Sequence, residues 1–160
     1  MANESDVSEA PVVLFACSSG GHLAQLLALR PWWVSRRRIW VTFDTSDAVS
    51  QLRDERVVWC YRPTTRNVRN LARNTVLAWR TFRRERPSLI VSNGAAIAFP
   101  FFVLAWLFRV PSIYVEIYER FDTHPTLTGR MCRPFATRFL LQWDEQLSLY
   151  PEGEVIGPLL

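Results

Sequence analysis

Residues 12–29 read VVLFACSSGGHLAQLLAL, so an apolar run, a turn with two glycines and a helical stretch follow one another directly. The first six residues are apolar throughout, which predicts a strand covered on both faces rather than a half-buried one. Gly20 and Gly21 allow a tight turn after this strand, and we expect the following helix to end or kink at Pro31. Strand, glycine turn and helix in this order predict a parallel α/β fold.

The same unit recurs along the chain. Further strands are expected at residues 39–43, 57–61, 89–91, 112–115 and 138–142, with helices at 46–53, 65–85, 95–108, 126–134 and 144–149. The alternation predicts one Rossmann-like domain over residues 11–160, a parallel sheet with helices on both faces. Residues 1–10 are polar and acidic, which predicts a disordered tail rather than a signal peptide.

The apolar stretch 95–108 contains Pro100 and is shorter than the roughly 20 residues that a membrane-spanning helix needs. It predicts a buried helix or one that lies in the membrane interface, with burial favoured. Cys17, Cys60 and Cys132 are far apart and have no metal-ligand spacing. We therefore expect three small buried side chains and no metal site.

Polar residues follow the expected strands, at the edge of a parallel sheet where ligands bind. The turn Ser18-Ser19-Gly20-Gly21-His22 opens a helix whose first amides can bind an anion, although a helix cap without a ligand is equally compatible. The His22 side chain can serve as a general base or donate to a phosphate. Its alternative role is a structural hydrogen bond to a neighbouring loop.

Two later strand ends carry further candidates. Asn93 and Gly94 follow the strand at 89–91 and can contact a sugar or a phosphate, unless they form an ordinary turn. Glu116 directly follows the strand at 112–115 and can deprotonate a hydroxyl nucleophile. Arg120 can bind a pyrophosphate bidentately, and the alternative for both charged residues is a structural ion pair.

The charge of the chain is concentrated in its middle. All 19 basic residues are arginines, and residues 11–141 combine these 19 with 8 acidic residues, a net charge of +11. Such a field favours an anionic partner such as lipid head groups, phosphates or nucleic acid. Nucleic acid is disfavoured because the chain has no recognisable nucleic-acid motif and because it would leave the strand-end turns unexplained.

The helix expected at 65–85 carries an arginine stripe. At 100° per residue, five arginines fall within a sector of about 60°, namely Arg66, Arg69, Arg73, Arg80 and Arg84. This stripe favours a membrane surface over an ordinary solvated face, as do Arg36-Arg37-Arg38 and the adjacent Trp32 and Trp33. A second face is expected to pack on the sheet through Val68, Leu71, Ala72, Thr75, Trp79 and Phe82.

Several segments together resemble a known family. They are Cys17-Ser18-Ser19-Gly20-Gly21-His22-Leu23, Val41-Thr42-Phe43-Asp44-Thr45-Ser46-Asp47-Ala48, Ser92-Asn93-Gly94-Ala95-Ala96, Tyr114-Val115-Glu116, Leu127-Thr128-Gly129-Arg130, Gln142-Trp143, Tyr150-Pro151 and Gly157-Pro158. In this order and spacing the chain resembles the PssD-type subunits of bacterial exopolysaccharide synthesis. These are related to the membrane-anchoring subunit of the eukaryotic two-subunit UDP-N-acetylglucosamine transferase. The family usually has a small hydroxyl residue where this chain has Ile117, and Glu119 is also unexpected.

The resemblance implies the N-terminal, acceptor-side half of a GT-B glycosyltransferase related to MurG. It places the Gly20-Gly21-His22 corner in the acceptor's pyrophosphate site and Glu116 in the cleft between the two halves. On this basis we expect the acceptor's pyrophosphate and first sugar to be held by Ser18, Ser19, Gly20, Gly21, Asn93, Gly94 and Arg120. The chain has no room for a second, nucleotide-binding domain, so a donor-binding, PssE-like partner subunit should supply the UDP-sugar site. Transfer to a polyprenyl-pyrophosphate-linked saccharide should invert the anomeric carbon without an essential metal or cofactor. His22 and Glu116 are the candidate bases, and Glu116 is slightly preferred because a carboxylate also suits a cleft that faces the donor subunit.

The expected location is the cytoplasmic face of the plasma membrane, with peripheral attachment. A different hypothesis is that the chain is a non-catalytic membrane anchor that recruits a catalytic partner. In that case the arginine stripe and the apolar helix would be its working parts, and Glu116 would be structural.

Overall fold

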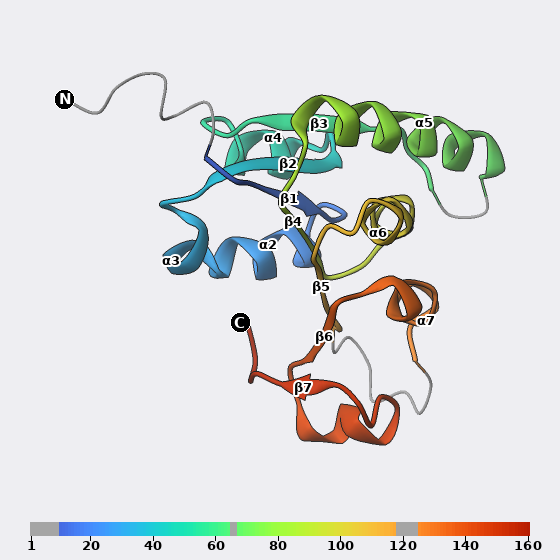
Figure 1. Cartoon of the computed structure of the whole chain (residues 1–160). Coiled ribbons are helices and arrows are strands. Elements are labelled where there is room, and N and C mark those ends of the chain that lie inside the picture. Colours follow the sequence, from blue (N-terminus) through green and yellow to red (C-terminus); the bar gives the residue numbers. More distant parts are fainter. Residues whose placement is uncertain (1–9, 65–66, 118–124) are drawn as a thin grey trace.

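The computed structural model describes residues 10–64, 67–117 and 125–160. Within these residues, seven strands form one parallel sheet in the order β3-β2-β1-β4-β5-β6-β7. Figure 1 shows this sheet running through the molecule between two layers of helices. The strands are β1 (Val12–Ala16), β2 (Arg37–Phe43), β3 (Val57–Cys60), β4 (Leu89–Ser92), β5 (Ser112–Val115), β6 (Arg138–Leu141) and β7 (Glu154–Val155). The doubly covered parallel sheet predicted from the sequence is confirmed.

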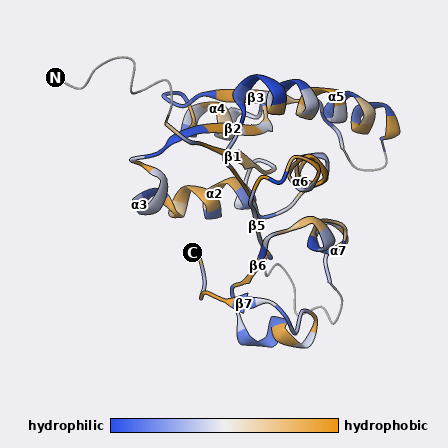
Figure 2. Ribbon diagram, viewed as in Figure 1, coloured by the Kyte–Doolittle hydropathy of each residue, from blue (hydrophilic) through white to orange (hydrophobic). Residues whose placement is uncertain are grey.

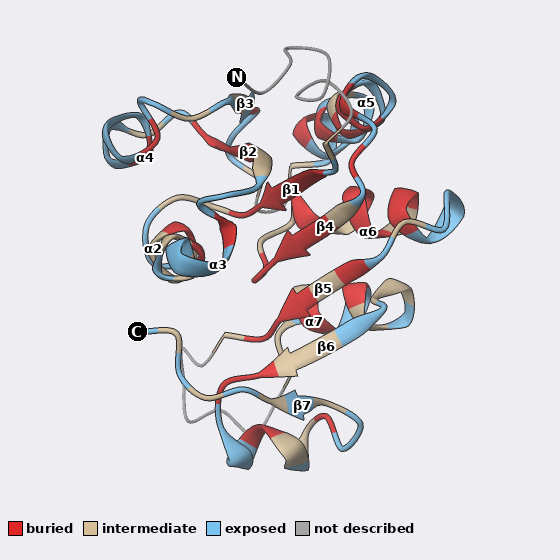
Figure 3. Ribbon diagram, turned by 60° about the vertical axis from the view of Figure 1, so that its left-hand side comes forward, coloured by how far each residue is buried: buried red, intermediate tan, exposed pale blue. Residues whose placement is uncertain are grey.

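The helices divide between the two faces of the sheet (Figure 3). One face is covered by α2 (Gly21–Ala28), α3 (Arg30–Trp33) and α4 (Ser46–Gln51), and the other by α5 (Val68–Glu85), α6 (Ala98–Leu107) and α7 (Leu127–Cys132). Short 3-10 helices follow at η1 (Arg133–Phe135) and η2 (Asp144–Ser148). The helix expected at 144–149 is therefore a 3-10 helix, and β7 is a strand that the sequence did not indicate.

All five residues of β1 are buried, and their side chains alternate between two cores. Leu14 and Ala16 face α5 and α6, whereas Val13 and Phe15 face α2 and α3. On the second side, Phe15 stacks on Trp40 with ring centroids 4.3 Å apart. Burial of each such side chain stabilises the fold by roughly 1.5–3 kcal/mol, which is why the central strand is apolar on both faces.

Helix α6 is buried along most of its length, as the apolar stretch predicted. Phe101 and Phe102 are 1% and 0% exposed, but the end of the helix leaves Trp106 61% exposed. Among the described residues, no helix combines the length and apolar character that crossing a membrane requires. The three cysteines are free and buried, as expected, and burial raises the pKa of Cys17 and Cys60 to about 12.

Helix α5 packs on a face that the sequence analysis did not identify. Of the residues expected to face the sheet, Phe82 is buried, but Val68 is 80%, Leu71 43% and Trp79 44% exposed. Ala72 and Thr75 are exposed as well. The buried face instead consists of Asn70, Asn74, Ala78, Thr81, Phe82 and Glu85.

Hydrogen bonds explain why a polar face of α5 is buried. Asn74 accepts a bond from the Tyr61 amide at 2.9 Å and donates to the Tyr61 carbonyl at 2.8 Å, so its side chain pairs with the backbone beyond β3. Glu85 binds Arg56 at 2.8 Å. Burying a polar side chain costs little free energy when it has hydrogen-bond partners. Because this polar face of α5 is buried, the apolar residues of the helix lie on the surface.

The two faces of α5 can be distinguished by their effect on stability. We expect Phe82→Ala to lower the free energy of unfolding by about 3–5 kcal/mol, because it leaves a cavity in the core. Val68→Ala should change it by less than about 0.5 kcal/mol, since Val68 faces solvent. Urea denaturation of the purified variants measures both values, and comparable losses would contradict this orientation of the helix.

Candidate functional site

The turns after β1 and β4 are joined by two reciprocal hydrogen bonds. The Nδ1 atom of His22 lies 3.0 Å from the carbonyl oxygen of Asn93, and the Asn93 side-chain amide donates to the His22 carbonyl at 2.8 Å. A carbonyl oxygen can only accept, so Nδ1 carries the proton and Nε2 is the basic nitrogen of the ring. Residues 71 positions apart in the sequence are thus fixed at one corner of the sheet.

Gly94 is required at this corner by both its backbone and its neighbours. Its φ is +123°, and a Cβ atom there would lie 3.1 Å from Cε1 of His22 and 3.1 Å from the Tyr114 hydroxyl. The absence of a side chain lets the imidazole lie against the backbone after β4. Gly94 therefore contributes to the position of His22 and does not merely form a turn.

The first turn of α2 opens the same corner. Gly20 is the N-cap residue with φ +75°, and no side chain caps the helix. The first amides of an α-helix have no intrahelical acceptor, so those of Gly21 and Leu23 are suited to an anion. The Gly20 amide itself donates to Asp47 at 3.1 Å. Ser18 and Ser19 are half-buried in the loop before the helix.

Two glutamines extend the polar corner towards β5 and β6. The Gln25 side-chain oxygen accepts from Asn93 at 3.2 Å and from Gln142 at 3.3 Å. Gln142 also donates to the backbone carbonyl of Glu116 at 3.0 Å. Gln25 was not predicted from the sequence as a site residue, although its position one turn after His22 on a helix was a usable signal. Gln142 was noticed through the family resemblance but was given no role.

Glu116 lies at the end of β5 in a closed environment. Its side chain is 2% exposed and accepts hydrogen bonds from the hydroxyls of Tyr150 at 2.7 Å and Thr126 at 2.8 Å. Burial raises the pKa of the Glu116 carboxyl above its ordinary value of 4.5, while the hydrogen bonds from Tyr150, Thr126 and the Ile117 amide act in the opposite direction. Tyr150 and Thr126 are site residues that the sequence analysis did not propose.

The structure brings most of the predicted site residues together. Ser18, Ser19, Gly20, Gly21, His22, Asn93 and Gly94 share one corner, and Glu116 is connected to it through Gln142. Arg120 and Arg66 lie outside the described residues. Among the described residues, no group of three or more histidine, cysteine, aspartate or glutamate side chains could hold a metal ion.

The family of proteins described as "Oligosaccharide biosynthesis protein Alg14 like" matches residues 13–159, which is nearly the whole chain. The chain belongs to this Alg14-like family. A UDP-N-acetylglucosamine transferase subunit alg14 from Schizosaccharomyces pombe is 30% identical over 104 residues, 62% of this chain and 48% of that protein. The PssD-type assignment within exopolysaccharide synthesis stays a prediction.

Similarity to longer proteins accompanies this family membership. A UDP-N-acetylglucosamine–N-acetylmuramyl-(pentapeptide) pyrophosphoryl-undecaprenol N-acetylglucosamine transferase from Geobacillus thermodenitrificans is 33% identical over 76 residues, 48% of this chain and 20% of that protein. The crystal structure of Acinetobacter baumannii MurG superposes with a TM-score of 0.74 at 15% identity, covering 94% of this chain and 46% of MurG. A UDP-N-acetylglucosamine 2-epimerase from Rickettsia bellii gives a TM-score of 0.72 at 10% identity, over 94% of this chain and 46% of the epimerase.

These comparisons confirm the predicted fold, the Rossmann-like N-terminal half of a GT-B protein. The four matches named above span between 20% and 48% of the relatives' own length. Together with the Alg14-like family, they relate the chain to glycosyltransferases.

A separate surface lies on the exposed side of α5, a helix along which hydrophilic and hydrophobic positions alternate (Figure 2). We call it the α5 surface, and it consists of Val68, Leu71, Val76 and Trp79 together with Arg69, Arg73 and Arg80, all exposed. Arg73 lies over the Tyr61 ring at 3.7 Å, and Arg84, which was also expected here, is bound to Glu85 at 2.6 Å.

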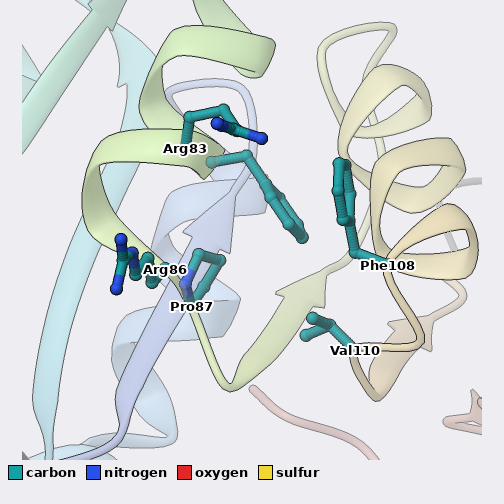
Figure 4. Close-up of a pocket in the computed structure, with 6 residues that line it drawn as sticks. Arg83, Arg86, Pro87, Phe108 and Val110 are labelled. Carbon is teal, nitrogen blue, oxygen red and sulfur yellow. The ribbon is translucent and has the colours of Figure 1, made fainter.

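The α5 surface continues onto the end of α6. The Trp79 and Phe108 rings are 5.8 Å apart, and Phe108 is exposed. Between the ends of the two helices lies a cavity of about 340 Å³, lined by Phe82, Arg83, Arg86, Pro87, Phe108 and Val110 (Figure 4). Trp33 does not belong to this surface, because α3 lies on the other face of the sheet and Trp33 is 2% exposed.

The close contact at Gly94 yields a stability prediction. Gly94→Ala should lower the free energy of unfolding by about 1–3 kcal/mol, because its Cβ would meet His22 and Tyr114 in a backbone conformation that favours glycine. Gly21→Ala is the matched control, since nothing lies within 4 Å of a Cβ there. Thermal unfolding of both variants measures the difference, and equal stability would contradict the tight corner.

The raised pKa of Glu116 predicts a pH dependence of stability. As the pH rises above 4.5, the Glu116 carboxyl loses its proton in the unfolded chain before it does so in the folded chain. The stability that the protonated carboxyl contributes is therefore complete at lower pH, and it is lost as the pH rises through the raised pKa of the folded state. The free energy of unfolding of the wild type should therefore fall relative to that of Glu116→Gln across this range. Urea denaturation at a series of pH values from 4 upward measures the free energy of unfolding of both proteins. If the two free energies change with pH in parallel, the pKa of Glu116 is not raised.

Proposed function

We propose that this chain is the acceptor-binding subunit of a two-component inverting glycosyltransferase. The enzyme moves a sugar from a UDP-sugar to a polyprenyl-pyrophosphate-linked saccharide in exopolysaccharide synthesis. Membership of the Alg14-like family and the GT-B half-fold support this proposal. The observation that carries it is the pair of hydrogen bonds that holds His22 and Asn93 beside the uncapped start of α2.

The proposed division of labour follows from the residues at the corner. The amides at the start of α2 suit the acceptor's pyrophosphate, with Arg120 as a further candidate, and the Asn93 corner suits the first sugar. The donor-binding, PssE-like subunit supplies the UDP-sugar site. Neither a resident cofactor nor a metal is part of the proposal.

The proposed reaction is a single displacement. The acceptor hydroxyl forms a bond to the anomeric carbon while the bond to UDP breaks on the opposite side, so the configuration inverts and UDP leaves with the electron pair. The hydroxyl proton passes to a base on this chain, for which His22 and Glu116 are the candidates. The half-buried His22 is favoured, because both carboxylate oxygens of Glu116 already accept hydrogen bonds in a closed environment.

We further propose that the complex is peripheral at the cytoplasmic face of the plasma membrane and that the α5 surface contacts the lipid. Apolar side chains beside arginines are suited to the interface of an anionic bilayer. Tryptophan prefers this interface, which fits the exposed Trp79. A purely anchoring subunit would use the same surface, so activity measurements decide between the two functions.

Co-expression with the candidate partner subunit tests the transferase. Release of UDP in the presence of a lipid-linked acceptor and a panel of UDP-sugars should require both chains. If a stable, membrane-bound complex releases no UDP with any donor, the non-catalytic anchor becomes the better description.

His22 can be tested in the same complex. We expect His22→Ala to lower kcat by about 100-fold or more, because a general base typically contributes 10²–10⁴. The variant should still assemble with its partner, which size-exclusion chromatography checks. A kcat within threefold of the wild type would exclude His22 as the base.

The α5 surface predicts a charge-dependent attachment. Arg69→Glu with Arg73→Glu should weaken binding to anionic vesicles by about 30-fold or more, at about 1 kcal/mol per basic residue. Arg30→Glu with Arg53→Glu is the matched control, because these exposed arginines belong to the opposite face. Sedimentation with vesicles measures both pairs, and equal losses would contradict the assignment. Activity on a soluble acceptor should persist.

A further inference from the structure

Both carboxylate oxygens of Glu116, at the end of β5, accept hydrogen bonds from neighbouring groups. Its Oε1 atom accepts from the Thr126 hydroxyl at 2.8 Å and from the Ile117 amide at 3.2 Å. Its Oε2 atom accepts from the Tyr150 hydroxyl at 2.7 Å, and the Thr126 hydroxyl is 3.1 Å away. With 2% exposure and donors at both oxygens, the carboxylate has no open side for a substrate hydroxyl.

The packing around this carboxylate is closed by a glycine. A Cβ atom on Gly129 would lie 2.0 Å from Oε2 of Glu116, 2.7 Å from the Tyr150 hydroxyl and 2.8 Å from Oγ1 of Thr126. Contacts below 3.0 Å do not occur for real Cβ atoms. The first turn of α7 therefore lies directly on the cluster, and no other residue at position 129 would permit this approach.

We propose that Glu116 is a positioning residue, whose fixed carboxylate ties the start of α7 and the Tyr150 segment to the end of β5 beside the acceptor corner. This inference rests on the proposed transferase function, in which His22 is the base. The acceptor's proton does not pass to Glu116.

The direction of the hydrogen bonds shows how the carboxylate acts. The Gly129 amide can only donate and uses a lone pair of Oγ1, so the single hydroxyl proton of Thr126 points to Glu116. The lone pairs of that hydroxyl are then available to the Gly129 amide, which donates to Oγ1 at 3.0 Å. Thr126 is the N-cap residue of α7, so Glu116 orients the side chain that caps this helix.

The same carboxylate fixes the segment that follows η2. Tyr150 is 2% exposed, and its ring lies 4.6 Å from that of Phe139 on β6. The backbone carbonyl of Glu116 accepts a hydrogen bond from the side-chain amide of Gln142. The same amide donates to the Gln25 side-chain oxygen, which also accepts from Asn93. Glu116 is thereby connected to the His22 corner through its backbone and to α7 and Tyr150 through its side chain.

Variants that keep the carboxylate but remove its donors separate the two roles. If Glu116 positions the site, Thr126→Ala and Tyr150→Phe should lower kcat/KM for the acceptor by about the same factor as Glu116→Gln, and the double variants should lose no more than the single ones. Thr126→Ser should restore activity because it keeps the hydroxyl. The acid limb of the kcat–pH profile should persist in Glu116→Gln.

The opposite pattern would overturn the proposal. If Glu116 were the base, Glu116→Gln would abolish the acid limb and lower kcat by at least about 100-fold. Tyr150→Phe and Thr126→Ala would then retain turnover, because the carboxylate would still be present.

A second measurement does not depend on activity. Hydrogen–deuterium exchange of the isolated chain should be at least about fivefold faster at residues 127–130 in Glu116→Gln and Thr126→Ala, as expected for the loss of a helix cap. Glu55→Gln is the matched control, because Glu55 is a partly buried carboxylate bound to Arg38 on the other face of the sheet. Unchanged exchange at these residues would overturn the positioning role even if the complex proves inactive, whereas an inactive complex with faster exchange would count against the transferase alone.

Discussion

The burial of β1 on both faces is the constraint on which the rest of the structure depends. Its five residues pair in parallel with β2 on one side, and Val13, Leu14 and Phe15 pair with β4 on the other. Its side chains enter two separate cores. A strand of this kind requires helices above and below, and each crossover then returns a turn to the same edge of the sheet. The glycine turn after β1 and the turn after β4 are neighbours for this reason, and His22 and Asn93 can bond although they are far apart in the sequence.

At that edge of the sheet, hydrogen bonds join the polar side chains of several strand ends into one network. Asn93, Gln25 and Gln142 link the His22 corner to the end of β5, and Glu116 continues the connection to Thr126 and Tyr150. Apart from the side-chain oxygen of Asn93, which is buried without a hydrogen-bond partner among the described residues, these side chains pair with one another. An alternative arrangement would leave further donors or acceptors unsatisfied in a region of low dielectric constant. A site organised in this way suits a reaction that needs one hydroxyl held beside one base.

Helix α5 connects the fold to the proposed membrane contact. Its buried side consists mainly of asparagine, alanine and threonine, together with a glutamate that is ion-paired with arginine. Its valine, leucine and tryptophan side chains therefore lie on the surface beside the arginines. The apolar surface at the end of α6 continues the same face. Burying the polar side of an amphipathic helix costs little when the buried groups have hydrogen-bond partners, and the outward apolar side is the one that we propose contacts the lipid.

The sequence by itself determined the parallel α/β fold, the positions of most elements and the corner formed by the glycine turn and His22, because these depend on local apolar runs and glycine turns. It also indicated Asn93, Gly94 and Glu116, since parallel strands place their ends on one edge. The tertiary structure alone decided which side of α5 is buried, because Asn74 meets the Tyr61 backbone only in three dimensions. It alone enclosed Glu116 between Thr126, Gly129 and Tyr150, residues whose separation along the chain conceals a shared hydrogen-bond network. Local periodicity specifies elements, whereas partner choice among buried polar groups depends on long-range packing.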